Sequence, residues 1–336
     1  MKAAVYDGTD IIIKEVPKPI LKDSQVLIKV KSVGICGTDL AILKGSLPTP
    51  TPLILGHEFT GEIIEVGKDV DQSLVGRRVT SEINSHIDKD CYFCERNMYT
   101  QCKSRKALGI DIDGALADYI AIEEYLIHEI PQEISYQEGT FIEPLAAAYQ
   151  TFEMMPLDKD DKIMAIFGMG KLGLLILQVA LLKGLKIIAI NGSEKKLKLA
   201  KKFGAFHVIN RLKTGDIVKI IKDITGGLGA DIVIDTSGNP AALKDVISSC
   251  RTRGKLHMKS THGLDTPINL TDIVVRELTV YSSRCGPFEK AIEGLKSGKI
   301  KIKDLISREY PLEKIKEAIA SYEESRDHIK TIVTLE

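Results

Sequence analysis

The 336-residue chain has no tryptophan, and aromatic residues make up only 5% of it. It has no excess of either charge, because 46 Lys and Arg residues balance 46 Asp and Glu residues. A dedicated nucleic-acid-binding protein needs a basic surplus, so the balance argues against nucleic acid as a partner. With 44% hydrophobic and 27% charged residues, the composition is that of an ordinary globular protein.

Long apolar runs are also missing. The most apolar stretch, residues 172–182, is interrupted by Gly173 and Gln178 and is shorter than the about 20 residues that a bilayer-spanning helix needs. The N-terminal residues 1–16 alternate in polarity as a strand does, and they lack the apolar core and cleavage site of a signal peptide. We therefore expect no membrane partner and a cytoplasmic location.

The chain changes character near residue 160, which indicates two domains. The first 140 residues read as short strands, among them 25–32, 61–66 and 117–122, and predict a partly open β-barrel. From 162–167 onward, apolar strands alternate with helices, which predicts a doubly wound parallel sheet and an α/β fold class.

The tail after Pro287 returns to two short helices and a last strand at 331–335, and we expect it to pack on the first domain. The predicted boundaries are 1–145 with 286–336 for the first domain and 146–285 for the second.

A glycine-rich turn predicts a dinucleotide site in the second domain. Gly168-Met169-Gly170-Lys171-Leu172-Gly173 matches G-x-G-x-x-G, follows a strand and opens a helix. The first glycine makes the tight turn, the second admits the pyrophosphate, and the third lets the helix pack on the strand. The free N–H groups of the helix N-terminus attract the anion.

The end of the next strand bears on the choice of cofactor. NAD enzymes usually carry an acid there, but this chain has Asn191, followed by Gly192 and Ser193. A carboxylate about 4 Å from a 2′-phosphate would be repelled by several kcal/mol, so its loss favours NADP. NAD stays an alternative because an asparagine also binds a ribose hydroxyl. The positive charge for the phosphate would come from Lys195, Lys196 or Arg211.

Three separated segments of the first domain offer metal ligands. Cys36 follows a strand, His57 and Glu58 are adjacent, and Glu143 precedes the second domain. Thiolate, imidazole and carboxylate all bind zinc, and a catalytic zinc keeps one position open. Each has a plainer interpretation: Cys36 as a small buried hydrophobe, Glu58 as a group behind the ligands, and Glu143 as a helix N-terminal charge.

Five motifs follow one another in a fixed order: GICGTD at 34–39, GHEFTGEI at 56–63, the cysteine loop at 88–102, EPLAA at 143–147 and the glycine motif. With these motifs the chain resembles the zinc-dependent medium-chain alcohol and polyol dehydrogenases along its whole length. The resemblance implies a GroES-like catalytic domain, a Rossmann domain and an active site between them. It also implies Cys36, His57 and Glu143 as zinc ligands, with Glu58 as an alternate ligand.

The same resemblance gives Thr38 the role of passing the alcohol proton outward. Many members have a histidine five residues after the ligand cysteine, but this chain has Ala41 there, so the family's relay is interrupted. His262 or Lys259 would be substitutes, although we expect both on the surface.

The cysteine loop corresponds to the family's structural zinc site, which has the spacing C-x2-C-x2-C-x7-C. This chain has Asp88 in the first position, followed by Cys91, Cys94 and Cys102. A Cys3Asp site is chemically reasonable because carboxylates also bind zinc. The alternatives are an empty reduced loop, an oxidised cysteine pair, or His86 or Asp90 as the fourth ligand.

The sequence thus predicts a zinc-dependent NAD(P) oxidoreductase that moves a hydride between a small alcohol, polyol or sugar and the nicotinamide. A zinc-free quinone or enone reductase on the same scaffold and a non-catalytic nucleotide-binding protein are the alternatives. Arg284, beyond the last parallel strand, would contact either the cofactor or the other domain. The strand at 278–282 would pair subunits of a homodimer or homotetramer, as in related proteins.

Overall fold

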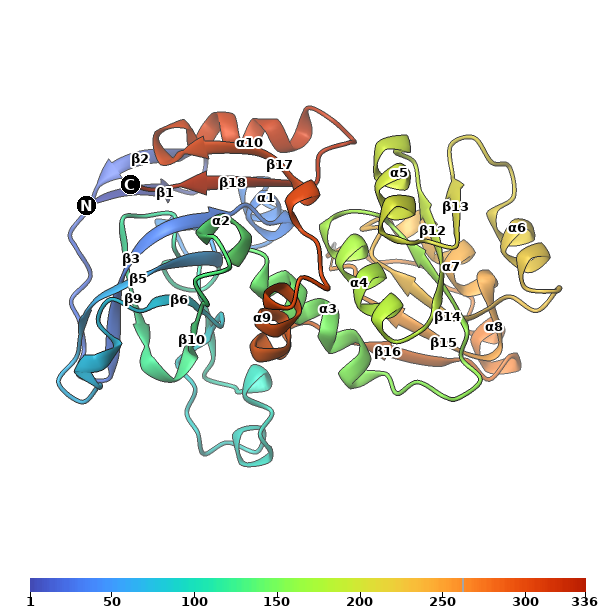
Figure 1. Ribbon diagram of the computed structural model, residues 1–336, viewed down its shortest axis with the longest axis horizontal. Helices are drawn as coiled ribbons and strands as arrows, with labels where there is room; N and C mark the ends of the chain where they lie inside the picture. Colours follow the sequence, from blue (N-terminus) through green and yellow to red (C-terminus); the bar gives the residue numbers. More distant parts are fainter. Residues whose placement is uncertain (262) are drawn as a thin grey trace. The chain divides into compact units, whose positions relative to one another are not determined.

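The computed structural model describes residues 1–261 and 263–336, so His262 lies outside the described residues. The chain forms two compact units, of which unit 1 holds residues 1–143 and 288–336 and unit 2 holds 144–287 (Figure 1). The boundaries expected from the sequence lie two residues from these (145 against 143, and 286 against 288). Among the described residues, no helix has both the length and the apolarity needed to cross a membrane.

The described part of unit 1 contains two larger sheets and a small two-stranded sheet formed by β7 and β8. One larger sheet has the order β10-β6-β5-β3-β18-β17, with β9 also paired to β3, and the other is β2-β1-β4. In the longest strand, β3, only Lys29 and Lys31 are half-buried and all other residues are buried, so both faces of this strand pack against other parts of the unit. The strands are β1 (Lys2–Tyr6), β2 (Ile11–Glu15), β3 (Gln25–Gly34), β4 (Leu53–Ile54), β5 (Glu58–Val66), β6 (Arg78–Ser81), β7 (Asn84–Ser85), β8 (Lys106–Ala107), β9 (Tyr119–Glu123), β10 (Ile127–Glu129), β17 (Ile306–Pro311) and β18 (Lys330–Thr334).

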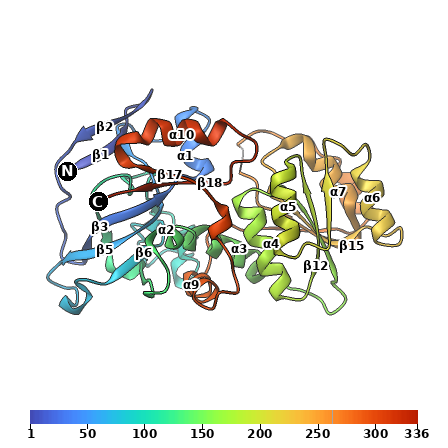
Figure 2. The same cartoon turned by 45° about the horizontal axis from the view of Figure 1, so that its top comes forward.

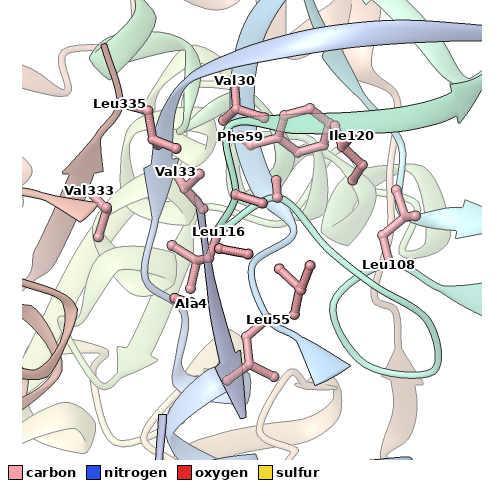
Figure 3. Close-up of a cluster of buried hydrophobic side chains, with 14 of the residues drawn as sticks. Ala4, Val30, Val33, Leu55, Phe59, Leu108, Leu116, Ile120, Val333 and Leu335 are labelled. Atoms are coloured by element: carbon pink, nitrogen blue, oxygen red, sulfur yellow. The ribbon is translucent and has the colours of Figure 1, made fainter. Parts of the chain in front are cut away.

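The core of unit 1 gathers side chains from distant parts of the sequence (Figure 3). Val33 of β3, Phe59 of β5 and Val333 of β18 are each at most 1% exposed. The helices of this unit are α1 (Gly37–Leu43), α2 (Tyr136–Gly139), α9 (Phe288–Lys296) and α10 (Ile315–Glu323), while α3 (Ile142–Met154) begins in unit 1 and continues in unit 2.

The C-terminal tail contains one more strand than the sequence predicted. The two helices and the last strand are present, and β17 pairs in parallel with β18. Helix α10 lies along both strands (Figure 2). The sequence gives little sign of β17 because its residues are exposed or only half-buried, so the apolar alternation that marks a strand is missing.

Unit 2 confirms the doubly wound parallel sheet. Its strand order is β13-β12-β11-β14-β15-β16, with every neighbouring pair parallel. Helices α4 and α5 lie on the near face in Figure 1, and α6 packs against α7. The elements are β11 (Ile163–Phe167), α4 (Lys171–Leu182), β12 (Lys186–Asn191), α5 (Glu194–Phe203), β13 (His207–Asn210), α6 (Ile217–Ile224), β14 (Ala230–Asp235), α7 (Leu243–Ser249), β15 (Cys250–Met258), α8 (Leu270–Val275) and β16 (Thr279–Ser282).

Candidate metal centres and cofactor site

The first candidate metal centre lies where β3 and β5 of unit 1 pair. Cys36 caps the N-terminus of α1 two residues after β3, and His57 and Glu58 stand at the start of β5. The register places Gly34 opposite Glu58. Gly56 has a φ of 93°, and a Cβ there would lie 2.9 Å from Val33 and Leu116, so this turn requires glycine.

The ligand atoms of Cys36, His57 and Glu58 all lie within 4.8 Å of one another. Two ligands on a tetrahedral zinc, at bond lengths of about 2.0–2.3 Å, lie about 3.3–3.8 Å apart, so the three side chains fit one ion after small movements. Glu143 is not in this group. It lies half-buried in the first turn of α3, and its role as a ligand stays a prediction.

Asp39 is a functional residue that the sequence interpretation missed. Its Oδ2 accepts a 2.7 Å hydrogen bond from the Cys36 backbone N–H, and its Oδ1 lies 3.7 Å from Nδ1 of His57. Metal-binding histidines commonly donate their second ring N–H to a carboxylate, which orients the ring. The Asp39 carboxylate thus lies beside Nδ1 of His57 at slightly more than hydrogen-bond distance, and Nε2 is the ring nitrogen that remains for a metal.

The centre has a negative potential. Burial disfavours a charged His57, but the Cys36 thiolate and the carboxylates of Asp39 and Glu58 outweigh burial and raise the pKa of His57 to about 10. A buried site that stabilises an imidazolium this strongly favours a cation. A zinc ion would supply that positive charge and leave the imidazole neutral.

Lys330, the first residue of β18, is a second residue that the sequence interpretation missed. Its side chain is fully buried, forms an ion pair with Glu58 and lies 5.1 Å from the centre of the Phe141 ring. A Cβ at Gly34 would collide with the Lys330 ammonium, so this glycine makes room for the lysine. Lysine is almost never fully buried without a partner, but the sequence does not reveal which strand supplies that partner.

Thr38 lies in α1 beside the proposed ligand. The Cys36 Sγ is 3.7 Å from the Thr38 Oγ1, and the threonine side chain is half-buried. Ala41 lies one turn further along the same helix and offers no proton-carrying group. The Thr38 hydroxyl therefore lies near the candidate metal centre. Ala41, which stands where many family members have the relay histidine, cannot carry a proton.

The second candidate metal centre is the cysteine loop of unit 1. Ligand atoms of Asp88, Cys91, Cys94 and Cys102 lie within 4.8 Å of one another. These are the four residues that the spacing of the cysteine loop predicted as ligands. His86 and Asp90 do not belong to this group. The His86 Nδ1 instead lies 2.7 Å from the Ser85 Oγ.

The hydrogen bonds of the loop orient Asp88 toward the thiols. Its Oδ1 accepts from the Cys91 backbone N–H at 3.1 Å, and its own N–H donates to the Cys102 Sγ at 3.4 Å. Burial opposes the charged form of Asp88. Hydrogen bonds from the Cys91 N–H and from the thiols of the three cysteines nevertheless lower the pKa of Asp88 below its ordinary value. Burial and the bond to Asp88 raise the pKa of the Cys94 thiol to about 12. A dication would displace the thiol protons, because metal binding and thiol deprotonation are coupled.

The glycine loop of unit 2 has the shape that a pyrophosphate needs. Gly168 adopts a φ of 101°, and a Cβ at Gly173 would collide with the Gly168 carbonyl oxygen. Gly170 caps α4 without a side-chain hydrogen bond, and a Cβ there would meet no atom within 4 Å. Open space in front of an uncapped helix N-terminus fits an anion. Lys171 and Leu172 form the half-buried first turn.

A cleft of about 330 Å³ lies at the carboxyl ends of β11, β12 and β14. Its lining includes Gly168, Asn191, Arg211 and Ser237. The Arg211 backbone N–H donates to the Asn191 carbonyl at 3.0 Å, and a Cβ at Gly192 would come within 3.4 Å of the Arg211 Nε. The same Cβ would lie 3.2 Å from the Leu212 side chain, so Gly192 leaves room for the side chains of Arg211 and Leu212 beside the residue that replaces the usual acid.

The other residues predicted to contact the cofactor phosphate lie at the start of α5, and their surroundings differ. Ser193 caps this helix, with its Oγ accepting a 3.1 Å hydrogen bond from the Lys196 N–H. Lys195 is exposed and Lys196 half-buried. Glu194 is held by Lys213 at 2.9 Å and by Asn210. The acid nearest to Asn191 along this helix therefore has cationic and amide partners of its own.

One residue at the carboxyl ends of β15 and β16 is more buried than the sequence predicted. Lys259 is only 7% exposed, so the predicted surface role is wrong. A lysine that follows a predicted strand gives no sequence signal of burial, because its acceptors lie in other segments. Arg284 is exposed two residues beyond β16.

Comparison with known proteins gives consistent results for both units. Residues 22–132 match the model of the alcohol dehydrogenase GroES-like domain, and residues 172–297 match that of the zinc-binding dehydrogenases. The chain is 35% identical to a D-arabitol-phosphate dehydrogenase from Enterococcus avium, over 99% of this chain and 95% of the relative. It is 36% identical to a sorbitol dehydrogenase from Bacillus subtilis strain 168, over 95% and 92% of the two chains.

A solved structure of a zinc-binding dehydrogenase from Sinorhizobium meliloti 1021 bound to NADP is similar along 99% of both chains, with a TM-score of 0.91 and 29% identity. The chain belongs to the zinc-type medium-chain dehydrogenase family. It combines a GroES-like domain with a Rossmann domain and is an oxidoreductase of the alcohol and polyol dehydrogenase type.

Replacing Lys330 by methionine is expected to lower the free energy of unfolding by about 3 to 5 kcal/mol, because Glu58 would remain buried without its cation. Chemical denaturation of the metal-free protein measures this loss. The control is Lys2→Met, which removes the lysine of the exposed Lys2–Glu313 pair and should leave the denaturation midpoint unchanged. If the two substitutions lowered the free energy of unfolding equally, the buried Lys330–Glu58 pair would not have the predicted effect on stability.

Proposed function

We propose that the protein is a zinc-dependent dehydrogenase of polyols or polyol phosphates that uses NADP in preference to NAD. The observation that carries the proposal is the convergence of Cys36, His57 and Glu58 on one point of unit 1. Zinc in such a site supplies a Lewis acid for the substrate oxygen, and the nicotinamide exchanges the hydride.

The residues of the chain have separate tasks at this centre. Cys36 and His57 hold the ion, and Asp39 orients the His57 ring. Glu58 and Glu143 supply carboxylate ligands that can exchange with each other or with water. Lys330 supports this exchange, because its ammonium remains paired with Glu58 when that carboxylate is not on the metal. Thr38 accepts the alcohol proton and passes it to water.

The cysteine loop is proposed to hold a second, structural zinc. Four ligands with three sulfurs and one carboxylate complete a closed tetrahedral site. Cys94 and Cys102 are 3% and 5% exposed, so the sulfur side of the site is protected from water. The Asp88 carboxylate is a harder ligand than a thiolate and is expected to hold the metal less firmly than a fourth cysteine would.

The preference for NADP rests on the cleft beside Asn191. No acid stands at the end of β12, Gly192 leaves space, and Arg211 lines the cleft. A guanidinium binds phosphate through charge and paired N–H groups. The pyrophosphate of the cofactor would be bound by the glycine loop, which consists of Gly168, Gly170 and Gly173 and the backbone of Lys171 and Leu172. Arg284 is proposed to contact the nicotinamide end of the cofactor.

The substrate class follows from the relatives. The curated relatives named above act on arabitol phosphate and on sorbitol, according to their names. An open metal position accepts a hydroxyl of any such compound. A zinc-free quinone or enone reductase is disfavoured, because such an enzyme does not need the three converging ligands.

We also propose that two copies of the chain associate through unit 2. Strand β16 lies at the edge of its sheet, and its Val280 is 48% exposed. Val274 and Val275 on the neighbouring α8 are 71% and 72% exposed. An open edge strand bordered by exposed apolar side chains is typical of an interface between copies, here a homodimer or half of a homotetramer. The cytoplasmic location stays a prediction.

Metal analysis should find two zinc ions per chain in the wild type. His57→Ala should retain one zinc and lose the reduction of NADP by a panel of polyols and polyol phosphates. Cys94→Ser should also retain one zinc but keep that activity in the folded fraction, so each variant is the control for the other. One zinc in the wild type and none in His57→Ala would contradict the loop site. Polyol oxidation that survives in His57→Ala and in chelator would contradict the proposed function.

Arg211→Ala should raise the KM for NADP at least about tenfold and leave the KM for NAD nearly unchanged, because one phosphate contact is lost. Asn191→Asp should shift the preference toward NAD by placing a carboxylate near the 2′-phosphate. Steady-state kinetics with both cofactors measures the two ratios. Lys195→Ala, which removes an exposed charge from α5, is the control. A wild type that prefers NAD would refute the assignment.

Val280→Asp should convert the assembly to a monomer of 37.0 kDa in light scattering, because the substitution places charge on the proposed pairing edge. Val75→Asp, at a valine of unit 1 that is 45% exposed, should leave the assembly intact. A wild type that is already monomeric at micromolar concentration would rule out this interface.

A further inference from the structure

The residue that directly follows β14 contacts the glycine loop of unit 2. Strand β14 pairs in parallel with β11, so that Asp235 lies opposite Phe167, and Thr236 comes next. The Thr236 backbone N–H donates to the Phe167 carbonyl at 2.9 Å. Its Oγ1 donates to the Gly168 carbonyl at 2.8 Å and lies 3.1 Å from the Phe167 carbonyl. Thr236 therefore extends the contact between β11 and β14 beyond both strands and into the glycine loop.

The first and third glycines of the loop both pack against Thr236. A Cβ at Gly168 would lie 2.6 Å from the Thr236 carbonyl oxygen. A Cβ at Gly173 would lie 1.9 Å from the Gly168 carbonyl oxygen and 2.9 Å from the Thr236 Oγ1. The Gly168 carbonyl is thus enclosed between the Thr236 hydroxyl and the first turn of α4. Because tightly packed groups transmit strain, a displacement of this carbonyl would also move the start of α4.

The segment that carries Thr236 is itself held in place. Asp235 is 7% exposed, and its Oδ1 accepts hydrogen bonds from the Ser237 N–H at 3.0 Å and from the Ser237 Oγ at 2.6 Å. The Gly238 N–H donates to the Ser260 Oγ at 2.9 Å, which connects this segment to the residues after β15. Thr236 is therefore fixed on both sides, so a change in its side chain is expected to displace the glycine loop rather than the segment after β14.

We propose that Thr236 positions the glycine loop for the pyrophosphate of the cofactor. This inference rests on the proposed nicotinamide-dependent function. The N–H groups at the start of α4 bind an anion best when they converge on it, and Gly170 leaves space in front of them. The Thr236 hydroxyl fixes the Gly168 carbonyl, against which Gly173 and the start of α4 pack. A methyl group in place of the hydroxyl cannot donate, and it needs about 3.3–3.6 Å from the same oxygen, so it would push the loop away.

The test compares dissociation constants for NADP, NAD and adenosine 2′-monophosphate, measured by calorimetry. Both dinucleotides contain the pyrophosphate, whereas the monophosphate contains only adenosine and the 2′-phosphate. Thr236→Val should raise the dissociation constants of both dinucleotides about five- to tenfold, because the hydrogen bond that fixes the loop is lost. The constant for adenosine 2′-monophosphate should not change. Thr236→Ser, which keeps the hydroxyl, should restore the wild-type constants for both dinucleotides.

Thr225→Val is the matched control. The Thr225 Oγ1 also contacts two backbone carbonyls of unit 2, those of Ile221 at 2.8 Å and Lys222 at 3.2 Å, but it does so at the end of α6. This substitution removes a hydroxyl of the same kind from a part of unit 2 without a glycine-loop contact. It should leave all three dissociation constants unchanged.

A loss of affinity in Thr236→Val that is equal for all three ligands, or that Thr236→Ser does not repair, would make Thr236 a general support of unit 2 and overturn the proposal. Unchanged affinities for both dinucleotides would overturn it as well. If Thr236→Val failed to fold, Thr236→Ala, which removes the hydroxyl and adds no bulk, would replace it in the same comparison. A wild type that binds neither dinucleotide would refute the proposed function itself, and this inference with it.

Discussion

The cost of burying charge decides how unit 1 is arranged around Glu58. This carboxylate is 1% exposed, and it lies beside a thiol, a second carboxylate and a buried imidazole. Such a group of acids is stable only with compensating cations. Lys330 supplies one from β18, and a metal ion bound by Cys36, His57 and Glu58 would supply another. The strands β5 and β18 both flank β3 in the sheet, so the fold brings the Lys330 ammonium and the three possible metal ligands to the same place.

This arrangement explains why the C-terminal tail returns to unit 1. Strand β18 pairs with β3 so that Ile332 lies opposite Gly34, and β3 pairs with β5 so that Gly34 lies opposite Glu58. A shift of one residue in either register would turn Lys330 or Glu58 to the other face of the sheet. Glycine at 34 is then needed, because any side chain there would occupy the space of the ammonium. The metal centre and the closure of unit 1 therefore depend on the same three strands.

The sequence predicted the parts of this protein that depend on local patterns. Apolar strands that alternate with helices predicted the parallel sheet of unit 2, and the structure has this sheet. Spacing predicted the cysteine loop, whose four side chains the fold brings together. The pairing of Lys330 with Glu58 and the burial of Lys259 could not be read in this way, because each depends on segments far apart in the chain. Strand β17 was missed since little of it is buried.

Charge placement also organises unit 2, although by a different rule. The glycine loop offers only backbone N–H groups to an anion, and Arg211 lies at one end of the carboxyl edge and Lys259 toward the other. The first cation lines a cleft, where the proposed cofactor phosphate would meet it. The second is buried and bonded to three oxygens before any ligand binds, so it has little freedom to reorganise. Through these bonds Lys259 connects the ends of β15 and β16 to α3, so its role within unit 2 is to hold these elements together.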